Sequence, residues 1–193
     1  MLFRSAFLFA PNLHLAMRQV MPARKQIAQK TIFNILGPLI NPARSTNQLI
    51  GVYSRSWVRP LAEVLHNLGS KHILVVHGAD GLDEVTTTDK TFVTEVAAGR
   101  LKDYEIIPED FGFKRARLND LLGGSIQENV KIVQDILGGN PGSRRDIVVF
   151  NAGCAIYAAD KANTIAEGIK LAQISIDSKA ALGKLKQLKE YSQ

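Results

Sequence analysis

The stretch Val75-Val76-His77-Gly78-Ala79-Asp80-Gly81-Leu82-Asp83-Glu84-Val85 decides the fold of this sequence. The run at residues 72–76 that leads into it is short, rich in β-branched residues and followed by turn residues, which is typical of a buried strand. Glycines let a backbone turn tightly, so we predict that the chain leaves this strand through a loop bearing three carboxylates. In open α/β sheets, ligands bind at such loops, beyond the carboxyl ends of the strands.

The neighbouring carboxylates of Asp83 and Glu84 indicate a cation site in this loop. Two adjacent negative charges repel each other unless a cation lies near them. Hard oxygen ligands suit Mg²⁺, which is usually bound by one or two carboxylates together with the phosphates of a substrate. The alternative is a solvated acidic turn, which is the better interpretation of an Asp-Glu pair taken alone. Other motifs in the chain favour the metal site.

The composition is that of an ordinary globular protein. The 193 residues suffice for one domain with a core, and a net charge of +6 permits anionic partners, from phosphorylated metabolites to nucleic acid. The single cysteine, Cys154, excludes an internal disulfide. No apolar run reaches the roughly 20 residues of a membrane helix, and no convincing cleavage site follows the first ten residues. We therefore expect a cytoplasmic protein.

Residues 48–80 have the pattern of a strand–helix–strand unit. A strand is predicted at 48–53 and an amphipathic helix at 56–68, with Gly69 as its C′ residue, before the strand at 72–76. Such a unit places its two strands parallel in one sheet.

A hairpin and several helices are predicted on either side of this unit. Residues 91–96 and 101–107 alternate as strands, joined at Ala98-Gly99-Arg100. Upstream, residues 13–28 have helical spacing broken by Pro22, and a short helix from Thr31 is expected to end at Gly37-Pro38. Downstream, helices are predicted over residues 125–137, 145–159, 164–176 and 179–191.

Four stretches of the sequence resemble the anthranilate phosphoribosyltransferases. They are Phe7-Leu8-Phe9-Ala10-Pro11-Asn12-Leu13-His14, Met21-Pro22-Ala23-Arg24-Lys25, Thr31-Ile32-Phe33-Asn34-Ile35-Leu36-Gly37-Pro38-Leu39 with Asn41-Pro42-Ala43, and Val76-His77-Gly78-Ala79-Asp80-Gly81-Leu82-Asp83-Glu84. The third and fourth together are specific to this family and its near relatives, and the likeness covers nearly the whole chain.

The resemblance implies a fold and an activity. The fold is α/β, with a central mostly parallel sheet flanked by helices and a β-hairpin excursion, of the C-terminal domain type found in nucleoside phosphorylases and phosphoribosyltransferases. Residues 1–193 would form this glycosyltransferase-type domain as a fragment of a longer two-domain chain. The activity is transfer of phosphoribose from phosphoribosyl pyrophosphate (PRPP) to the amino group of anthranilate, in tryptophan biosynthesis. The resemblance also implies that Mg²⁺ is the metal cofactor and that the full-length protein forms a homodimer.

The resemblance also assigns residues to roles. Asp83 and Glu84 match the acidic pair that holds Mg²⁺ on the pyrophosphate, and Arg24 matches the arginine that meets the anthranilate carboxylate. His14 and Pro38 match residues that line the channel of the aromatic substrate. A guanidinium fork pairs bidentately with a carboxylate. No general acid or base is assigned, because an aromatic amine already carries a free lone pair.

Two departures from the family pattern leave alternatives open. The Gly-Thr-Gly-Gly-Asp loop and the Lys-His-Gly-Asn stretch that build most of the family's PRPP site do not occur in these residues, and Leu15 stands where proline is usual. We therefore expect little or no transferase activity from this chain alone. The alternatives are a relative with another acceptor, a nucleic-acid-binding relative of the same fold, and a remnant without activity.

Overall fold

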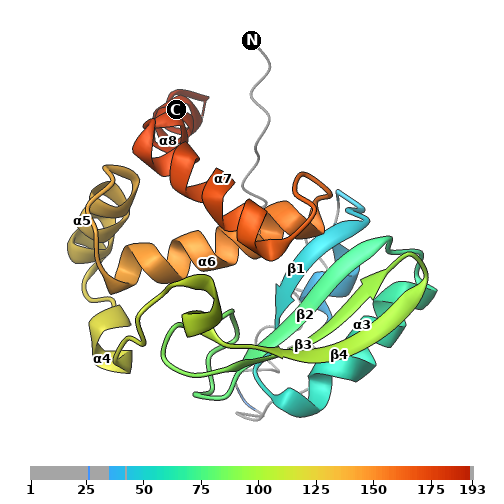
Figure 1. The fold of residues 1–193 in the computed structure, drawn as a ribbon. Coiled ribbons are helices and arrows are strands. Elements are labelled where there is room, and N and C mark those ends of the chain that lie inside the picture. Colours follow the sequence, from blue (N-terminus) through green and yellow to red (C-terminus); the bar gives the residue numbers. More distant parts are fainter. Residues whose placement is uncertain (1–25, 27–34, 42, 192–193) are drawn as a thin grey trace.

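Strand β2 (His72–Gly78) lies at the centre of the fold, and all seven of its residues are buried. The computed structural model describes residues 26, 35–41 and 43–191, in which a four-stranded sheet has helices packed on both faces (Figure 1). The α/β class predicted from the sequence is confirmed. The run at residues 72–76 is apolar on both sides because β2 faces a helical layer on each side of the sheet.

The sheet has the strand order β1–β2–β3–β4. β1 (Asn47–Gly51) is parallel to β2, and α3 (Val58–Asn67) connects them, which confirms the strand–helix–strand unit. β3 (Thr91–Ala97) and β4 (Arg100–Ile106) are antiparallel to their neighbours. The prediction of a mostly parallel sheet is therefore wrong for the described strands. The hairpin is no excursion, because β3 pairs with the free edge of β2 along all seven residues and completes the same sheet.

The hairpin turn is where the sequence predicts it. Ala98 and Gly99 both have positive φ, at 49° and 74°, as the two central residues of a type I′ turn require. β4 forms one edge of the sheet, and most of its residues are exposed. The exposed residues of β4 are polar, namely Arg100, Lys102, Asp103 and Glu105, as expected at a sheet edge, whereas Leu101 and Tyr104 pack against the two core clusters.

Two helical layers cover the sheet. α3 packs on one face, where Leu61, Ala62 and Leu65 meet Ile73 and Val75 of β2. α6 (Ser143–Ala158) covers the other face, and α7 (Ile165–Asp177) packs against α6. Further from the sheet, α4 (Leu118–Leu121), α5 (Ile126–Leu137) and α8 (Ala180–Tyr191) pack on α6 and α7. The short helices η2 (Gly37–Ile40), η3 (Arg55–Trp57) and η4 (Pro108–Phe111) lie in the connections.

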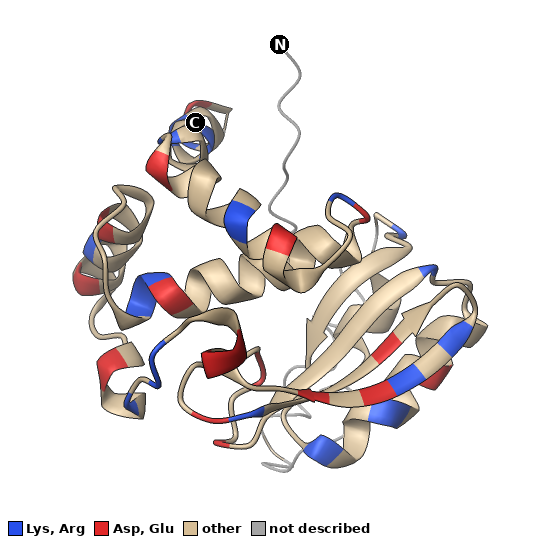
Figure 2. Ribbon diagram, in the orientation of Figure 1, with Lys and Arg blue, Asp and Glu red and all other residues tan. Residues whose placement is uncertain are grey.

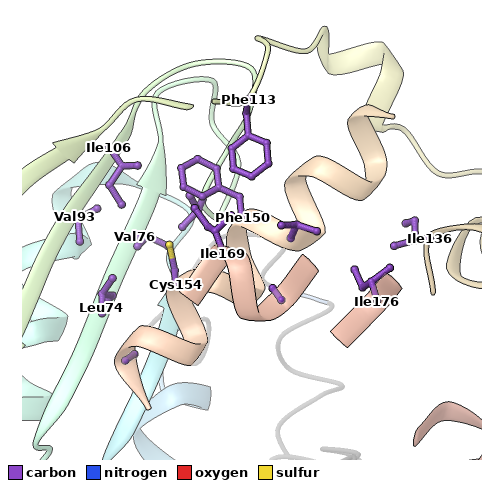
Figure 3. Packing of buried hydrophobic residues seen from close by; sticks show 14 residues of the cluster. Leu74, Val76, Val93, Ile106, Phe113, Ile136, Phe150, Cys154, Ile169 and Ile176 are labelled. Carbon is purple, nitrogen blue, oxygen red and sulfur yellow. The ribbon is translucent and has the colours of Figure 1, made fainter. Parts of the chain in front are cut away.

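Phe150 of α6 is the largest side chain that is completely buried, and it joins the sheet to the helices. Its ring centroid lies 5.0 Å from that of Phe113 and 5.3 Å from that of Phe111. In Figure 3, Phe150 and Cys154 point from α6 toward Val76 of β2. Burial raises the pKa of the Cys154 thiol to about 12, so this cysteine is a small core residue, as its apolar setting predicts.

Two predictions about helices differ from the structure. Gly37-Pro38 begins the helical turn η2, because the fixed φ and missing N–H of proline suit a first helical position. The predicted helix from Thr31 lies outside the described residues as far as Asn34. In α5 the capping box of Ser125 and Glu128 is confirmed. Only part of its apolar face is buried, however: Ile136 is 9% exposed, whereas Val130 is 52% exposed. The helices predicted within residues 13–28 lie outside the described residues, apart from Gln26. Among the described helices, none is both long and apolar enough to cross a membrane.

A polar network, buried at His72 and Glu95, joins the sheet to the end of α6, at the opposite end of β2 from the acidic loop. His72 Nδ1 lies 2.6 Å from Asp160 Oδ1, and His72 Nε2 lies 3.0 Å from Glu95 Oε1. Tyr157 donates its hydroxyl to the same Glu95 oxygen at 2.7 Å. Burial and the Glu95 carboxylate raise the pKa of Tyr157 to about 12, so its hydroxyl keeps the proton that it donates. Asn47 of β1 completes the network by donating to Asp160 at 2.8 Å.

Replacing His72 is expected to destabilise the fold. The change His72→Leu removes the ring donor to the buried Glu95 carboxylate, which keeps the Tyr157 hydroxyl, and leaving a buried group one hydrogen bond short costs about 1–3 kcal/mol. Urea denaturation followed by circular dichroism measures the change. The control is His66→Leu on the surface of α3, which is expected to change the free energy of unfolding by less than about 0.5 kcal/mol. Equal effects of the two changes would show that the network adds no stability.

Candidate functional site

The acidic loop joins β2 to β3 and begins with a tight turn. The amide of Gly78 donates to the Leu82 carbonyl at 2.8 Å, and the amide of Gly81 donates to the Gly78 carbonyl at 3.0 Å. Gly81 has a φ of 94°, a left-handed conformation that few other residues adopt. The Gly-x-x-Gly spacing in the sequence therefore has a direct structural reason. The turn carries Leu82, Asp83 and Glu84 back toward the end of β1.

Asp80 holds the two halves of the loop together. Its Oδ1 accepts from the Leu82 amide at 3.0 Å, and its Oδ2 accepts from the Thr86 hydroxyl at 2.5 Å and from the Thr88 hydroxyl. Burial acts to raise the pKa of Asp80, but these hydroxyl and amide donors outweigh it and lower the pKa overall. Asp80 is thus a structural anchor, although the sequence alone presents it only as one more acidic residue.

Gly51, the last residue of β1, meets the backbone of the acidic pair. A Cβ atom placed on Gly51 would lie 1.5 Å from the carbonyl oxygen of Asp83, far inside contact distance. Only glycine lets the loop approach β1 so closely. Because β1 and β2 are parallel, their carboxyl ends lie at the same edge of the sheet, and the acidic pair lies there too.

The carboxylates of Asp83 and Glu84 have no cationic partner among the described residues, and neither accepts a hydrogen bond from one of them. Asp83 is exposed and Glu84 is half-buried. Burial raises the pKa of Glu84, and the negative charges of Asp83 and Asp80 raise it further. This local excess of negative charge is what a bound cation would compensate.

The pair fits Mg²⁺ only together with other ligands. In the part of the chain that the structure describes, no group of three or more His, Cys, Asp or Glu side chains could hold a metal ion by itself. Mg²⁺ is commonly bound through one or two carboxylates, with waters and substrate phosphates completing its shell. Two adjacent carboxylates at an open loop meet that requirement.

Of the other predicted site residues, only Pro38 lies among the residues that the structure describes. His14 and Arg24 lie outside the described residues, so their roles stay predictions. Pro38 lies in η2 and is half-buried, and its neighbour Leu39 packs against the core cluster of α3 and β1. The structure brings Asp83 and Glu84 together at the edge of the sheet.

Sequence reasoning missed three residues that build the site: Asp80, Gly51 and Asn151. Asn151 lies on α6 and contacts the loop from 66 positions further along the chain. A polar amide within the otherwise apolar run of residues 147–156 is the one signal that could have drawn attention to it. Gly51 gives no such signal, because a glycine at a strand end has many explanations.

Replacing Gly51 tests the close approach. Gly51→Ala must push the Asp83 backbone away, and overpacking of this kind costs about 1–3 kcal/mol. We expect a lower thermal midpoint and faster amide hydrogen exchange in residues 79–88. The control is Gly183→Ala in α8, where no atom lies within 4 Å of the added Cβ. That change is expected to leave the loop unaltered. Unaltered exchange in Gly51→Ala would show that the close approach of β1 does not hold the loop in place.

Comparison with known proteins gives a consistent result. Residues 3–182 match the family described as "Glycosyl transferase family, a/b domain". The anthranilate phosphoribosyltransferase of Methanobrevibacter smithii is 52% identical over 186 residues, which are 96% of this chain and 56% of that protein. The crystal structure of the Thermus thermophilus enzyme has a TM-score of 0.88 at 40% identity, covering 94% of this chain and 54% of the other.

A further solved structure contains ligands. The anthranilate phosphoribosyltransferase of Saccharomyces cerevisiae in complex with PRPP and Mg has a TM-score of 0.82 at 29% identity, covering 90% of this chain and 50% of that one. The chain spans about half the length of the curated relatives that it matches.

Proposed function

Because the chain belongs to the glycosyl transferase family whose a/b domain it matches over residues 3–182, we propose that it supplies the α/β part of an anthranilate phosphoribosyltransferase. The reaction joins the ribose C1 of PRPP to the amino nitrogen of anthranilate and releases pyrophosphate. The observation that carries the proposal is the acidic pair without a cationic partner among the described residues at the edge of the sheet, in a chain similar to an enzyme solved with PRPP and Mg.

In this proposal Asp83 and Glu84 would hold Mg²⁺. The ion would supply positive charge to the leaving pyrophosphate, which gathers negative charge as the bond to C1 breaks. The loop's own contribution is position. Asp80 and Gly51 keep the two carboxylates at the carboxyl edge of the sheet, where the ligands of open α/β sheets bind.

The acceptor half of the site is proposed to lie on residues before β1. Arg24 would pair with the anthranilate carboxylate, and His14 and Pro38 would line the channel for its ring. The amino nitrogen attacks C1 with its own lone pair, the electrons of the broken C–O bond leave with pyrophosphate, and the nitrogen then loses a proton. No base is needed before attack, so catalysis would rest on positioning and on charge stabilisation.

The remaining parts of the proposal concern the whole protein. We propose that residues 1–193 act with a glycine-rich phosphate loop that this sequence lacks. Such loops present backbone N–H groups to phosphates, so this chain alone would turn over little substrate. A two-domain homodimeric protein in the cytoplasm is part of the same proposal.

The acidic pair is expected to determine divalent metal affinity. Replacing both carboxylates, in Asp83→Asn with Glu84→Gln, removes two oxygen ligands and is expected to weaken Mn²⁺ binding at least tenfold. Mn²⁺ serves as the probe because carboxylate sites for Mg²⁺ also accept it, and electron paramagnetic resonance counts the free ion. The matched control is Asp89→Asn, on the same loop but paired with Arg115 at 3.5 Å. Equal affinities in all three proteins would refute the metal assignment.

Arg24 is expected to determine the affinity for the acceptor. A hydrogen-bonded charge pair contributes about 1.5–3 kcal/mol, so Arg24→Gln should weaken anthranilate binding about tenfold or more. Quenching of anthranilate fluorescence measures it. Aniline, which has the ring and the amine but no carboxylate, is the control ligand and should bind both proteins equally. If anthranilate binds the variant as tightly as the parent, the role assigned to Arg24 is wrong, and a different acceptor substrate must be considered.

A further inference from the structure

Asn151 of α6 holds the backbone of Val85 at both of its polar groups. Its Oδ1 accepts from the Val85 amide at 2.9 Å, and its Nδ2 donates to the Val85 carbonyl at 2.7 Å. Nδ2 also donates to the Ile147 carbonyl one helical turn earlier, at 2.9 Å. These three hydrogen bonds fix the orientation of the amide, with its oxygen toward the Val85 N–H.

Val85 directly follows the acidic pair and is completely buried. Buried backbone N–H and C=O groups need hydrogen-bond partners, because leaving one unpaired costs free energy comparable to a lost hydrogen bond. The residue lies outside the strands and helices, so no ladder supplies those partners. Asn151 does, and it thereby fixes the chain at the position next to Glu84.

Three contacts therefore surround the acidic pair. Asp80 holds Leu82 on one side, Gly51 meets the carbonyl of Asp83, and Asn151 holds Val85 on the other side. The Asp80 contact acts within the loop, and the Gly51 contact only limits how closely the loop can approach β1. Asn151 alone among these three connects the loop to the helical layer. Its removal would free the segment that carries Glu84 while leaving both carboxylates in place.

We infer that Asn151 is a positioning residue for the Asp83–Glu84 pair, acting through the backbone of Val85. The inference rests on the proposed function in one respect, namely that the pair binds a divalent cation. Residues that orient metal ligands typically contribute 10- to 100-fold to metal affinity, and we expect an effect in that range for Asn151.

The chain contains a matched control for this residue. Asn129 of α5 makes the same pair of bonds to Gly124, accepting from its amide at 2.9 Å and donating to its carbonyl at 3.1 Å. Asn129→Ala thus removes the same pair of hydrogen bonds from a loop that carries no acidic pair, at an exposed position. Loss of an asparagine–backbone bond pair as such would affect both variants, whereas a positioning role would lower metal affinity only in Asn151→Ala.

The experiment measures loop order and metal affinity on the full chain. We expect amide hydrogen exchange in residues 82–88 to be at least tenfold faster in Asn151→Ala, with a Mn²⁺ dissociation constant raised about 10- to 100-fold. Asn129→Ala should change neither. In Asn151→Asp the side chain keeps an acceptor for the Val85 amide and loses the donor to its carbonyl, so its exchange rate should lie between those of the parent and Asn151→Ala. Asn151→Asp also provides the measurement if Asn151→Ala does not fold.

Each outcome bears on the inference. Unchanged hydrogen exchange in residues 82–88 of Asn151→Ala overturns it. If Asp83→Asn weakens Mn²⁺ binding but Asn151→Ala speeds exchange without changing Mn²⁺ affinity, the inference is overturned as well. If Asp83→Asn does not alter Mn²⁺ binding, the proposed metal ligand fails instead. Hydrogen exchange then decides by itself whether Asn151 holds the pair in place.

Discussion

The burial of β2 on both faces is the constraint on which the rest of this structure depends. A strand covered on each side can carry no charged residue in its middle, so the polar groups of this region collect at its two ends. At the amino end they pair with one another, as His72 does with Glu95 and Asp160. At the carboxyl end the carboxylates of Asp83 and Glu84 have no cationic partner among the described residues. One end fastens the sheet to α6, and the other is available for binding.

Charge is mixed along the described helices and strands. Figure 2 shows Lys and Arg positions interspersed with Asp and Glu along α3 and β4, and on the helices of the other layer. Several of these charges form pairs, such as Arg59 with Asp103 at 2.7 Å and Lys90 with Glu105 at 3.0 Å. Five Lys and Arg residues and no Asp or Glu fall in residues 1–34, so most of the net charge of +6 lies outside the described elements, which carry little net charge themselves.

The sequence allowed the elements to be predicted wherever a local pattern governs them. The alternation of residues 91–107, the capping box at Ser125 and the amphipathic run before Gly69 each depend on residues close together in the chain. The relative orientation of the strands was predicted incorrectly as mostly parallel. It depends on which edge of β2 the hairpin meets, and no local pattern specifies that edge. The adjacent carboxylates of Asp83 and Glu84 can be read from the sequence, but their metal-binding role rests on the resemblance and stays a prediction. Asn151 and Gly51 were not recognisable, because their roles arise from contacts between distant segments.

That separation in the chain has a kinetic consequence. The hairpin and the strand–helix–strand unit close short loops, whereas the bond between Asn151 and Val85 spans 66 residues and the bond between Asn47 and Ala158 spans 111. Contacts of long sequence separation form only after the entropy of closing a large loop has been overcome. The strand pairs and the short-range bonds of Asp80 can therefore form before α6 docks, whereas the hydrogen bonds of Asn151 to Val85 form only with that docking. A refolding chain would regain its strands before it regains its binding geometry.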